Sequence, residues 1–171
     1  MSLSLHTQPT PPSPGLPAPP PELVSFIKNR EAWRAQPYLD VAGLPTIGYG
    51  HRIPHLDHEP LTEDEGLQLL ASDIHQRMVL LDALHPTVPL WTEPAPRWSA
   101  IVDFAFNCGV EAYAGSHLRQ FVEAEDWPGA AAQIVLWCHA RNPVTHQLEV
   151  QPGLMSRREA EARWLLSGSF E

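Results

Sequence analysis

The segment from Glu31 to His51 constrains the fold more than any other part of the chain, because glycine and proline separate two short runs of strand-forming residues there. The Gly43–Pro45 turn divides residues 38–41 from residues 46–49. Two such runs joined by a short glycine-containing turn are typical of a β-hairpin. We therefore expect a hairpin at this place. Side chains that alternate along each strand should then share one face of it.

A helix is expected before this hairpin. Pro21 suits the first helical position, and Leu23, Ile27 and Glu31 follow at intervals of four residues. The helix should end before Pro37, because the residue ahead of a proline is pushed out of α geometry. Glu31 is thus expected near the C-terminal end of an apolar stripe. Both the apolar neighbours and the helix terminus disfavour a negative charge at that position.

Glu31 and Asp40 therefore form a pair of carboxyl groups in different surroundings, one favouring the protonated form and one the ionised form. Such a pair is the minimum equipment for cutting a glycosidic bond. Plainer interpretations stay open for each residue. Glu31 could be a solvated glutamate paired with Arg34 or Lys28, Asp40 could cap the turn, and Thr46, which opens the second run, could simply favour a strand.

The remainder of the chain predicts helices. Thr62 and Glu65 have the spacing of a capping box at the start of a helix of about twenty residues, long enough to join two lobes. We expect an α+β fold that is mainly helical, with further helices near 97–107, 116–125, 127–140 and 156–166. The expected organisation is a proline-rich flexible tail over 1–21 followed by one domain over 22–171. Within this domain we expect a small lobe at about 22–61, a connecting helix at about 62–84 and a helical lobe at about 85–171.

Composition excludes several classes of function. Residues 1–21 hold eight prolines and no Asp, Glu, Lys or Arg, which favours a semi-extended tail. The formal net charge of −9 argues against nucleic acid as a partner. We expect no stable membrane insertion and no secretory signal, since the sequence has no apolar run of about 20 residues and no apolar segment at its start. Cys108 and Cys138 are expected to be free buried thiols, although a disulfide between them stays open.

Several segments, in order, resemble one known family. EAWRAQPYLDVAGLPTIGYGH (31–51) resembles the opening motif of phage-type lysozymes, the endolysins. TEDEGLQLLASDI, FAFNCG, SHLRQF and PGLMSRREAEARWLL are similar to later segments of that family, so that the resemblance covers roughly 23–166. The sequence departs from the family pattern at Ala32, at Pro37 and at Cys108, none of which removes a reactive group. The resemblance implies a lysozyme-like fold.

The resemblance also implies roles for individual residues. Glu31 would be the general acid, Asp40 the second carboxylate, Thr46 the residue that positions a water, and Asn107 a substrate-contacting amide. The family cleaves the β-1,4 bond between N-acetylmuramic acid and N-acetylglucosamine in peptidoglycan, needs no cofactor and is thought to invert the anomeric centre. Inversion requires carboxyl groups about 6.5–9.5 Å apart, against about 5–5.5 Å for retention.

Other candidate residues have supporting or competing interpretations. His51 is expected to brace the hairpin through a hydrogen bond to a carboxylate such as Asp73. Arg157 or Arg158 is expected to hold the closing helix near the cleft or near Glu31. The alternative for both is a surface arginine. Asn107 could instead cap a helix before Gly109. The run HRIPHLDHEP has no spacing that defines a metal site, so no metal is expected. Core packing is favoured over sugar stacking for most of the tryptophans, namely Trp91, Trp98, Trp127, Trp137 and Trp164.

Four hypotheses for function remain at this stage. The first is an endolysin that acts as a monomer on peptidoglycan, waits in the host cytoplasm and depends on a separate pore to reach the wall in the periplasm. The second is a lytic transglycosylase, which captures the sugar's own hydroxyl instead of water. The third is a non-catalytic wall-binding module, and the fourth is a bacterial muralytic effector with the same chemistry but another route of delivery.

Overall fold

The computed structural model describes residues 15–40, 42–86, 90–142 and 144–171. It divides into two compact units whose boundary lies inside a long helix, where one unit ends at Gln76 and the other begins at Arg77. Most of the expected proline-rich tail (1–14), together with Val41 at the end of the first expected strand, lies outside the described residues. No described helix has both the length and the apolar character required to cross a membrane.

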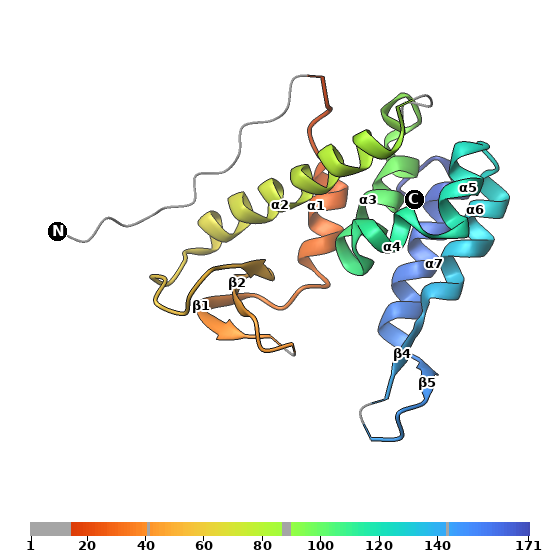
Figure 1. Ribbon diagram of the computed structural model, residues 1–171. Helices are drawn as coiled ribbons and strands as arrows, with labels where there is room; N and C mark the ends of the chain where they lie inside the picture. Colours follow the sequence, from red (N-terminus) through yellow and green to blue (C-terminus); the bar gives the residue numbers. More distant parts are fainter. Residues whose placement is uncertain (1–14, 41, 87–89, 143) are drawn as a thin grey trace. The chain divides into compact units, whose positions relative to one another are not determined.

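The first unit contains the expected hairpin, extended by a short third strand. Helix α1 (Pro21–Lys28) is followed by β1 (Arg34–Leu39), β2 (Pro45–Gly48) and β3 (His51–Arg52). The strands form an antiparallel sheet in the order β1-β2-β3 (Figure 1). The fold class predicted from the sequence is confirmed, since helices dominate and the sheets are small.

The first helix ends before Pro37, as predicted, but it does not reach Glu31. Helix α1 ends at Lys28 and Glu31 lies in a bend beyond it, although the Glu31 amide still donates to the Ile27 carbonyl at 3.1 Å. Pro37 lies inside β1 and does not terminate a helix. An edge strand tolerates a proline, because the missing N–H need not serve a neighbouring strand. The pairing register shifts between Arg34 and Tyr38, which accommodates the proline.

Helix α2 (Glu63–Leu84) begins with the expected capping box. The Thr62 amide and hydroxyl donate to Glu65 Oε2 at 2.8 and 2.7 Å, and the Glu65 amide donates back to Thr62 Oγ1 at 3.3 Å. In the first unit, Glu63 also accepts from Lys28 Nζ at 2.7 Å and from the Tyr49 hydroxyl at 3.1 Å. This start of α2 is therefore tied both to the end of α1 and to the residue that follows β2.

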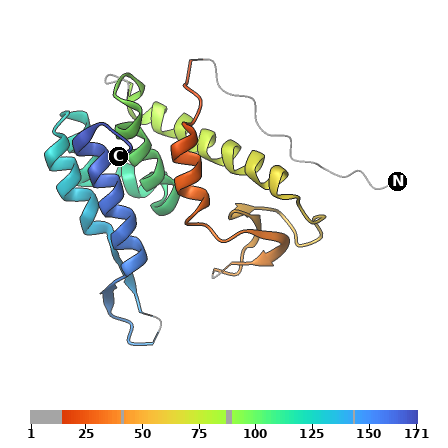
Figure 2. The same ribbon diagram turned by 180° about the vertical axis from the view of Figure 1, so that it is seen from behind.

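The second unit is a helical assembly in which α7 packs against both α3 and α6 (Figures 1 and 2). Helix α5 packs against α6 in turn. Buried aliphatic and aromatic side chains of α3, α5, α6 and α7 form its core. Its elements are η1 (Leu90–Thr92), α3 (Ala95–Cys108), α4 (Val110–Ala114), α5 (His117–Glu123), α6 (Trp127–Ile134), η2 (Val135–Trp137), β4 (His139–Arg141), β5 (Leu148–Val150) and α7 (Pro152–Ser167).

The helix predicted over 127–140 is too long. Helix α6 ends at Ile134, a single 3₁₀ turn follows, and residues 139–141 pair with residues 148–150 in a second hairpin. The pairing supplies backbone partners that a continued helix would otherwise have to provide. The Gln151 amide also donates to the Cys138 carbonyl at 2.9 Å, which closes the base of this hairpin.

The core residues agree largely with expectation. Trp98, Trp127 and Trp164 are buried, whereas the Trp137 side chain is 37% exposed and packs edge-on against Phe104. Both cysteines are free thiols, as expected; Cys138 is buried and Cys108 is half-buried.

Candidate functional site

Asp40 occupies the turn between β1 and β2 and is fixed there by backbone amides. Its Oδ1 accepts hydrogen bonds from the amides of Ala42 and Leu44, at 2.8 and 2.9 Å. Its own backbone closes the turn, since the Asp40 amide donates to the Leu44 carbonyl at 3.0 Å and its carbonyl accepts from Gly43 at 2.9 Å. Gly43 has a φ of +77°, a conformation that glycine adopts without strain. The turn-capping interpretation of Asp40 is thus confirmed, and the cap also fixes the orientation of the carboxylate.

The surroundings of Asp40 favour its charged form. The Leu44 amide, the Ala42 amide and the Arg52 guanidinium together lower the pKa of Asp40 below its ordinary value, with the Leu44 bond contributing most. Arg52 Nη2 lies 3.6 Å from Oδ2, the oxygen that the turn amides do not hold. Asp40 is accordingly ionised at neutral pH and has one oxygen directed away from the turn.

Thr46 and Asp40 both bond the backbone of Leu44 through their side chains. The Thr46 side chain is buried, and its Oγ1 donates to the Leu44 carbonyl at 2.9 Å. The same residue therefore receives the hydroxyl proton of Thr46 and provides an amide to Asp40. Because this bond uses the only proton of the hydroxyl, Thr46 can only accept a hydrogen bond from a further group such as water.

Glu31 lies between α1 and β1, in the same unit as Asp40 and Thr46. The residue is half-buried, so the expectation that it would continue the buried stripe of Leu23 and Ile27 is wrong. Those two side chains are fully buried within α1. Glu31 gains its position from the backbone bond to Ile27, which holds the chain close to the end of the helix before β1 begins.

His51 makes the contact that the sequence suggested. Its Nδ1 lies 3.0 Å from both carboxylate oxygens of Asp73, which joins β3 to α2 in the first unit. Both side chains are largely buried. Of the other histidines in this region, His58 contacts the Glu59 carbonyl through Nδ1 at 2.6 Å. Among the described residues, no three His, Cys, Asp or Glu side chains gather in a way that could hold a metal ion.

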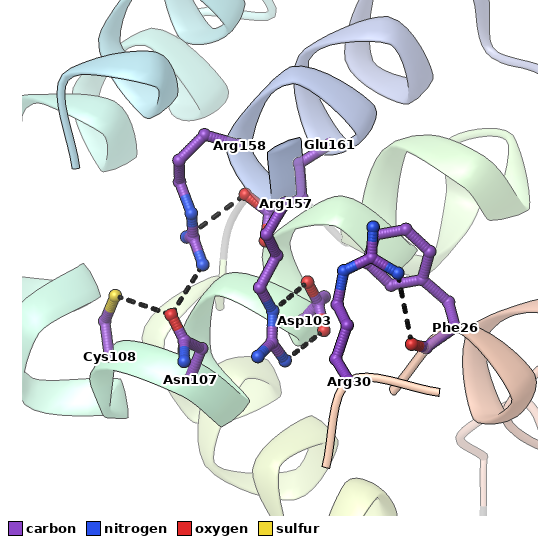
Figure 3. A network of polar contacts seen from close by, with 8 residues as sticks. All are labelled: Phe26, Arg30, Asp103, Asn107, Cys108, Arg157, Arg158 and Glu161. Carbon is purple, nitrogen blue, oxygen red and sulfur yellow. Dashed lines mark hydrogen bonds and ion pairs between the residues drawn. The ribbon is translucent and has the colours of Figure 1, made fainter. Parts of the chain in front are cut away.

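Asn107 and Arg157 belong to the second unit and take part in a network of polar contacts between α3 and α7 (Figure 3). Asn107 is exposed in the last turn of α3, where its Oδ1 accepts from Arg158 Nη2 at 2.7 Å and from the Cys108 thiol at 3.6 Å. It does not act as the helix cap, because Gly109 takes that position with a φ of +95°.

Arg157 is a buried ion-pair partner, so the surface alternative is wrong. Its Nε and Nη2 donate to the two oxygens of Asp103 at 2.9 and 2.7 Å, which joins α7 to α3 (Figure 3). Burial alone would raise the pKa of Asp103, but the bonds from Arg157 and the charge of Arg158 hold it below the ordinary value. Burial, reinforced by Asp103, raises the pKa of Glu161 well above the ordinary value.

Sequence reasoning missed Arg52, Asp103 and Glu161. Arg52 lies opposite Thr46 in the pairing of β2 with β3, and a third strand had not been expected. Asp103 interrupts the apolar stripe of α3, which is the usual signal of a buried pair. Arg158 and Glu161 have the i,i+3 spacing of a helical ion pair and lie 3.1 Å apart.

The fold and the hairpin site together define a class: small, mainly helical α+β proteins that hold an ionised carboxylate in a β-turn and a buried threonine in the strand that follows it. The family model for phage lysozyme matches residues 28–161, and this chain belongs to that family. It is 35% identical over 134 residues to the SAR-endolysin of Escherichia phage Mu, covering 78% of this chain and 72% of that protein. It is 33% identical over 136 residues to the endolysin of Acyrthosiphon pisum secondary endosymbiont phage 1, covering 80% and 89% of the two chains.

Solved structures show the same fold. The endolysin from Escherichia coli O157:H7 phage FAHEc1 superimposes with a TM-score of 0.73 at 24% identity, over 92% of this chain and 98% of that one. The muramidase domain of SpmX from Asticaccaulis excentricus gives a TM-score of 0.75 at 26% identity, over 86% and 97% of the two chains. The lysozyme-like fold expected from the resemblance is therefore confirmed.

Proposed function

We propose that this chain is an endolysin that hydrolyses the β-1,4 bond between N-acetylmuramic acid and N-acetylglucosamine in peptidoglycan. The supporting observation is the hairpin, in which backbone amides hold Asp40 ionised and the carbonyl of Leu44, which also supplies one of those amides, fixes the buried hydroxyl of Thr46. Membership of the phage lysozyme family and relatives named as endolysins support the same substrate.

The proposed reaction assigns a separate task to each residue. Glu31 donates its proton to the glycosidic oxygen as the bond to the anomeric carbon breaks, while Asp40 stabilises the positive charge that develops on the sugar ring. A water attacks the anomeric carbon from the opposite face and gives a proton to Asp40. Thr46 accepts a hydrogen bond from this water, since its own proton is held by the Leu44 carbonyl. The products are a new reducing end and a free hydroxyl on the leaving sugar, with inversion at the anomeric carbon.

Supporting roles complete the proposal. His51 and Asp73 hold β3 against α2 and thereby keep Arg52 beside Asp40. Arg157 fixes α7 to α3, and Asn107 contacts a sugar. We further propose that the protein acts as a monomer without a cofactor, and that a separate pore or delivery system gives it access to the wall from the host cytoplasm. The same chemistry would serve a bacterial effector delivered in another way.

The decisive experiment compares the wild type with Glu31→Gln on Gram-negative cells whose outer membrane has been permeabilised. We expect clearing by the wild type and a loss of several orders of magnitude in the variant, because removal of a proton donor raises the barrier to bond cleavage. Glu22→Gln, an exposed position in α1, is the matched control and should clear as the wild type does. Equal clearing by Glu31→Gln and the wild type would refute the role of Glu31.

Product analysis separates hydrolysis from the alternatives. Reducing ends in the digest support a hydrolase, whereas anhydro-sugar ends would mean that a lytic transglycosylase had captured the sugar's own hydroxyl. Binding to walls without release of either product would instead identify a non-catalytic module. The anomeric form of the first product, followed by NMR during digestion, tests inversion directly.

A further inference from the structure

The second hairpin carries a large share of the exposed apolar side chains. Among the described residues, ten large hydrophobic side chains are exposed, and half of them lie between residues 136 and 150, namely Leu136, Trp137, Val144, Leu148 and Val150. Strands β4 and β5 pack chiefly against each other and extend beyond the ends of α6 and α7 (Figures 1 and 2). We call the described residues of 136–150 the projecting hairpin. Concentrated apolar exposure of this kind marks an interaction surface.

One face of the projecting hairpin is open and the other is partly covered. His139 pairs with Val150, and Arg141 pairs with Leu148. Because side chains alternate along a strand, these four belong to one face, and all of them are exposed. Glu149, which lies between Leu148 and Val150, is half-buried on the other face. The open face therefore combines apolar side chains with a guanidinium and an imidazole.

The segment around the projecting hairpin is poor in negative charge. The chain has 20 Asp and Glu residues, yet Glu149 is the only one between Trp127 and Arg158. Its carboxylate is bonded within the hairpin, where Oε2 accepts from Asn142 Nδ2 at 2.8 Å and Oε1 accepts from the Thr145 hydroxyl at 2.9 Å. In a protein of formal net charge −9, this segment can therefore approach an anionic surface with little repulsion.

The tip of the projecting hairpin satisfies its backbone internally. Asn142 Oδ1 accepts from the amides of Val144 and Thr145 at 2.8 and 3.1 Å. The Asn142 amide donates to the Gln147 carbonyl at 2.8 Å, and the Asn142 carbonyl accepts from the His146 amide at 2.9 Å. An apolar medium offers no replacement for such bonds, so internal pairing is the condition under which a backbone can enter it. Contact with water or with a polar partner imposes no such condition.

We propose that the projecting hairpin is a docking surface for a lipid bilayer that contains anionic headgroups. Val144 and Leu148 enter the interface, while the Arg141 guanidinium contacts headgroup phosphate. Arg141 Nη1 donates to the His146 carbonyl at 2.6 Å, which holds the guanidinium beside the tip, and its further N–H groups can serve phosphate. Trp137, at the base of the hairpin, is a residue type enriched at membrane–water interfaces. Such binding is peripheral and reversible.

Lipid binding and cleavage can be measured separately. The projecting hairpin belongs to the second unit, whereas Glu31, Asp40 and Thr46 belong to the first. The inference thus goes beyond the proposed function and does not depend on it. If both hold, the hairpin would keep the enzyme on the membrane side of the wall that it cleaves.

The test measures sedimentation of the full chain with vesicles of phosphatidylcholine, with and without phosphatidylglycerol. The wild type should bind the mixed vesicles more tightly. Leu148→Ser should weaken that binding roughly tenfold, because the interface loses the apolar area of a leucine. Leu166→Ser, at the end of α7, is the matched control and should bind as the wild type does. Both variants should keep the wild-type melting temperature, since the two leucines are 68% and 54% exposed.

A second pair of variants tests the contribution of charge. Arg141→Gln should weaken binding to the mixed vesicles about fivefold and change binding to phosphatidylcholine little, because an arginine is attracted only by anionic headgroups. Added salt should produce a similar loss in the wild type. Arg141→Lys should keep the binding, and Arg163→Gln, an exposed arginine of α7, should bind as the wild type does. An equal loss on both kinds of vesicle would refute the contact with phosphate.

Several outcomes would overturn the proposal. One is a wild type that sediments with neither kind of vesicle, and another is equal binding by Leu148→Ser and the wild type. A third is a dimer in analytical ultracentrifugation that Leu148→Ser abolishes, because the open face would then join two copies of the chain. Lipid binding without release of products from peptidoglycan would uphold the inference and refute the proposed hydrolysis. Hydrolysis without lipid binding would do the reverse.

Discussion

The buried pair of Arg157 and Asp103 offers the sharpest test of what holds the second unit together. Asp103 is fully buried, the Arg157 side chain is 5% exposed, and the two bonds measure 2.9 and 2.7 Å. Replacing Arg157 with methionine roughly keeps the volume but leaves the buried Asp103 carboxylate without the partner that bonds both of its oxygens. Loss of one partner of such a pair costs about 3–5 kcal/mol. For a chain of this size, that corresponds to a fall in Tm of about 6–20 °C.

Urea denaturation followed by circular dichroism measures the loss, and a third variant tests its cause. The double variant Arg157→Met with Asp103→Leu replaces both charges with apolar side chains and should be more stable than Arg157→Met alone. Lys28→Met, which removes the exposed pair with Glu63, is the control and should have a far smaller effect. The reasoning would be refuted if Arg157→Met lost less than about 1 kcal/mol, or if the double variant were the least stable of all.

The pH dependence gives an independent check with a defined sign. In the wild type the pKa of Asp103 is lowered, so its stabilisation is present above its unfolded-state pKa of about 3.9 and is lost as pH falls through the folded value. In Arg157→Met the buried carboxyl should prefer its neutral form, and acid should then relieve the destabilisation. The gap in stability between the two proteins should therefore narrow as pH falls from 7 towards 5. A gap that widens over this range would contradict the assignment.

Three further predictions concern single residues. Asp40→Asn keeps the oxygen that caps the turn but removes the negative charge. Cell clearing should therefore fall by orders of magnitude, while the far-ultraviolet circular dichroism spectrum stays unchanged. Loss of the folded spectrum would mean that the charge serves only to hold the turn. Gly66→Ala should lower Tm, because a Cβ at this position would lie 2.1 Å from the Trp33 ring. Gly153→Ala is the control and should not lower Tm, because a Cβ there would have nothing within 4 Å. Equal Tm values for the two variants would disprove the close contact. Burial lowers the pKa of His85, so stability should decline as pH falls below about 6.5, and His85→Gln should flatten this decline in thermal melts between pH 7 and 5.

Local patterns predicted those elements whose stabilising contacts lie close together in sequence. The capping box of Thr62 and Glu65 spans three residues, and the turn that contains Asp40 and Gly43 closes within five, so residue identity alone specifies both. The proposed roles of Asp40 and Thr46 came from the resemblance of the segment 31–51 to a known family, and the bonds that orient each of them are also local, since both involve Leu44.

Features that depend on distant partners were decided by the tertiary structure. Pro37 argued for a helix end on local grounds, yet it lies in an edge strand paired with β2, and α1 ends earlier, at Lys28. The second hairpin replaced the end of a predicted helix, because residues 139–141 pair with residues 148–150, which lie seven (148 − 141) to eleven (150 − 139) positions further along the chain. Arg157 and Arg158 looked alike in sequence, and only the packing of α7 on α3 gave one to Asp103 and the other to Asn107. Short-range hydrogen bonds can be inferred from neighbouring residues, whereas the burial of a charge and the choice of its partner exist only once separate elements pack.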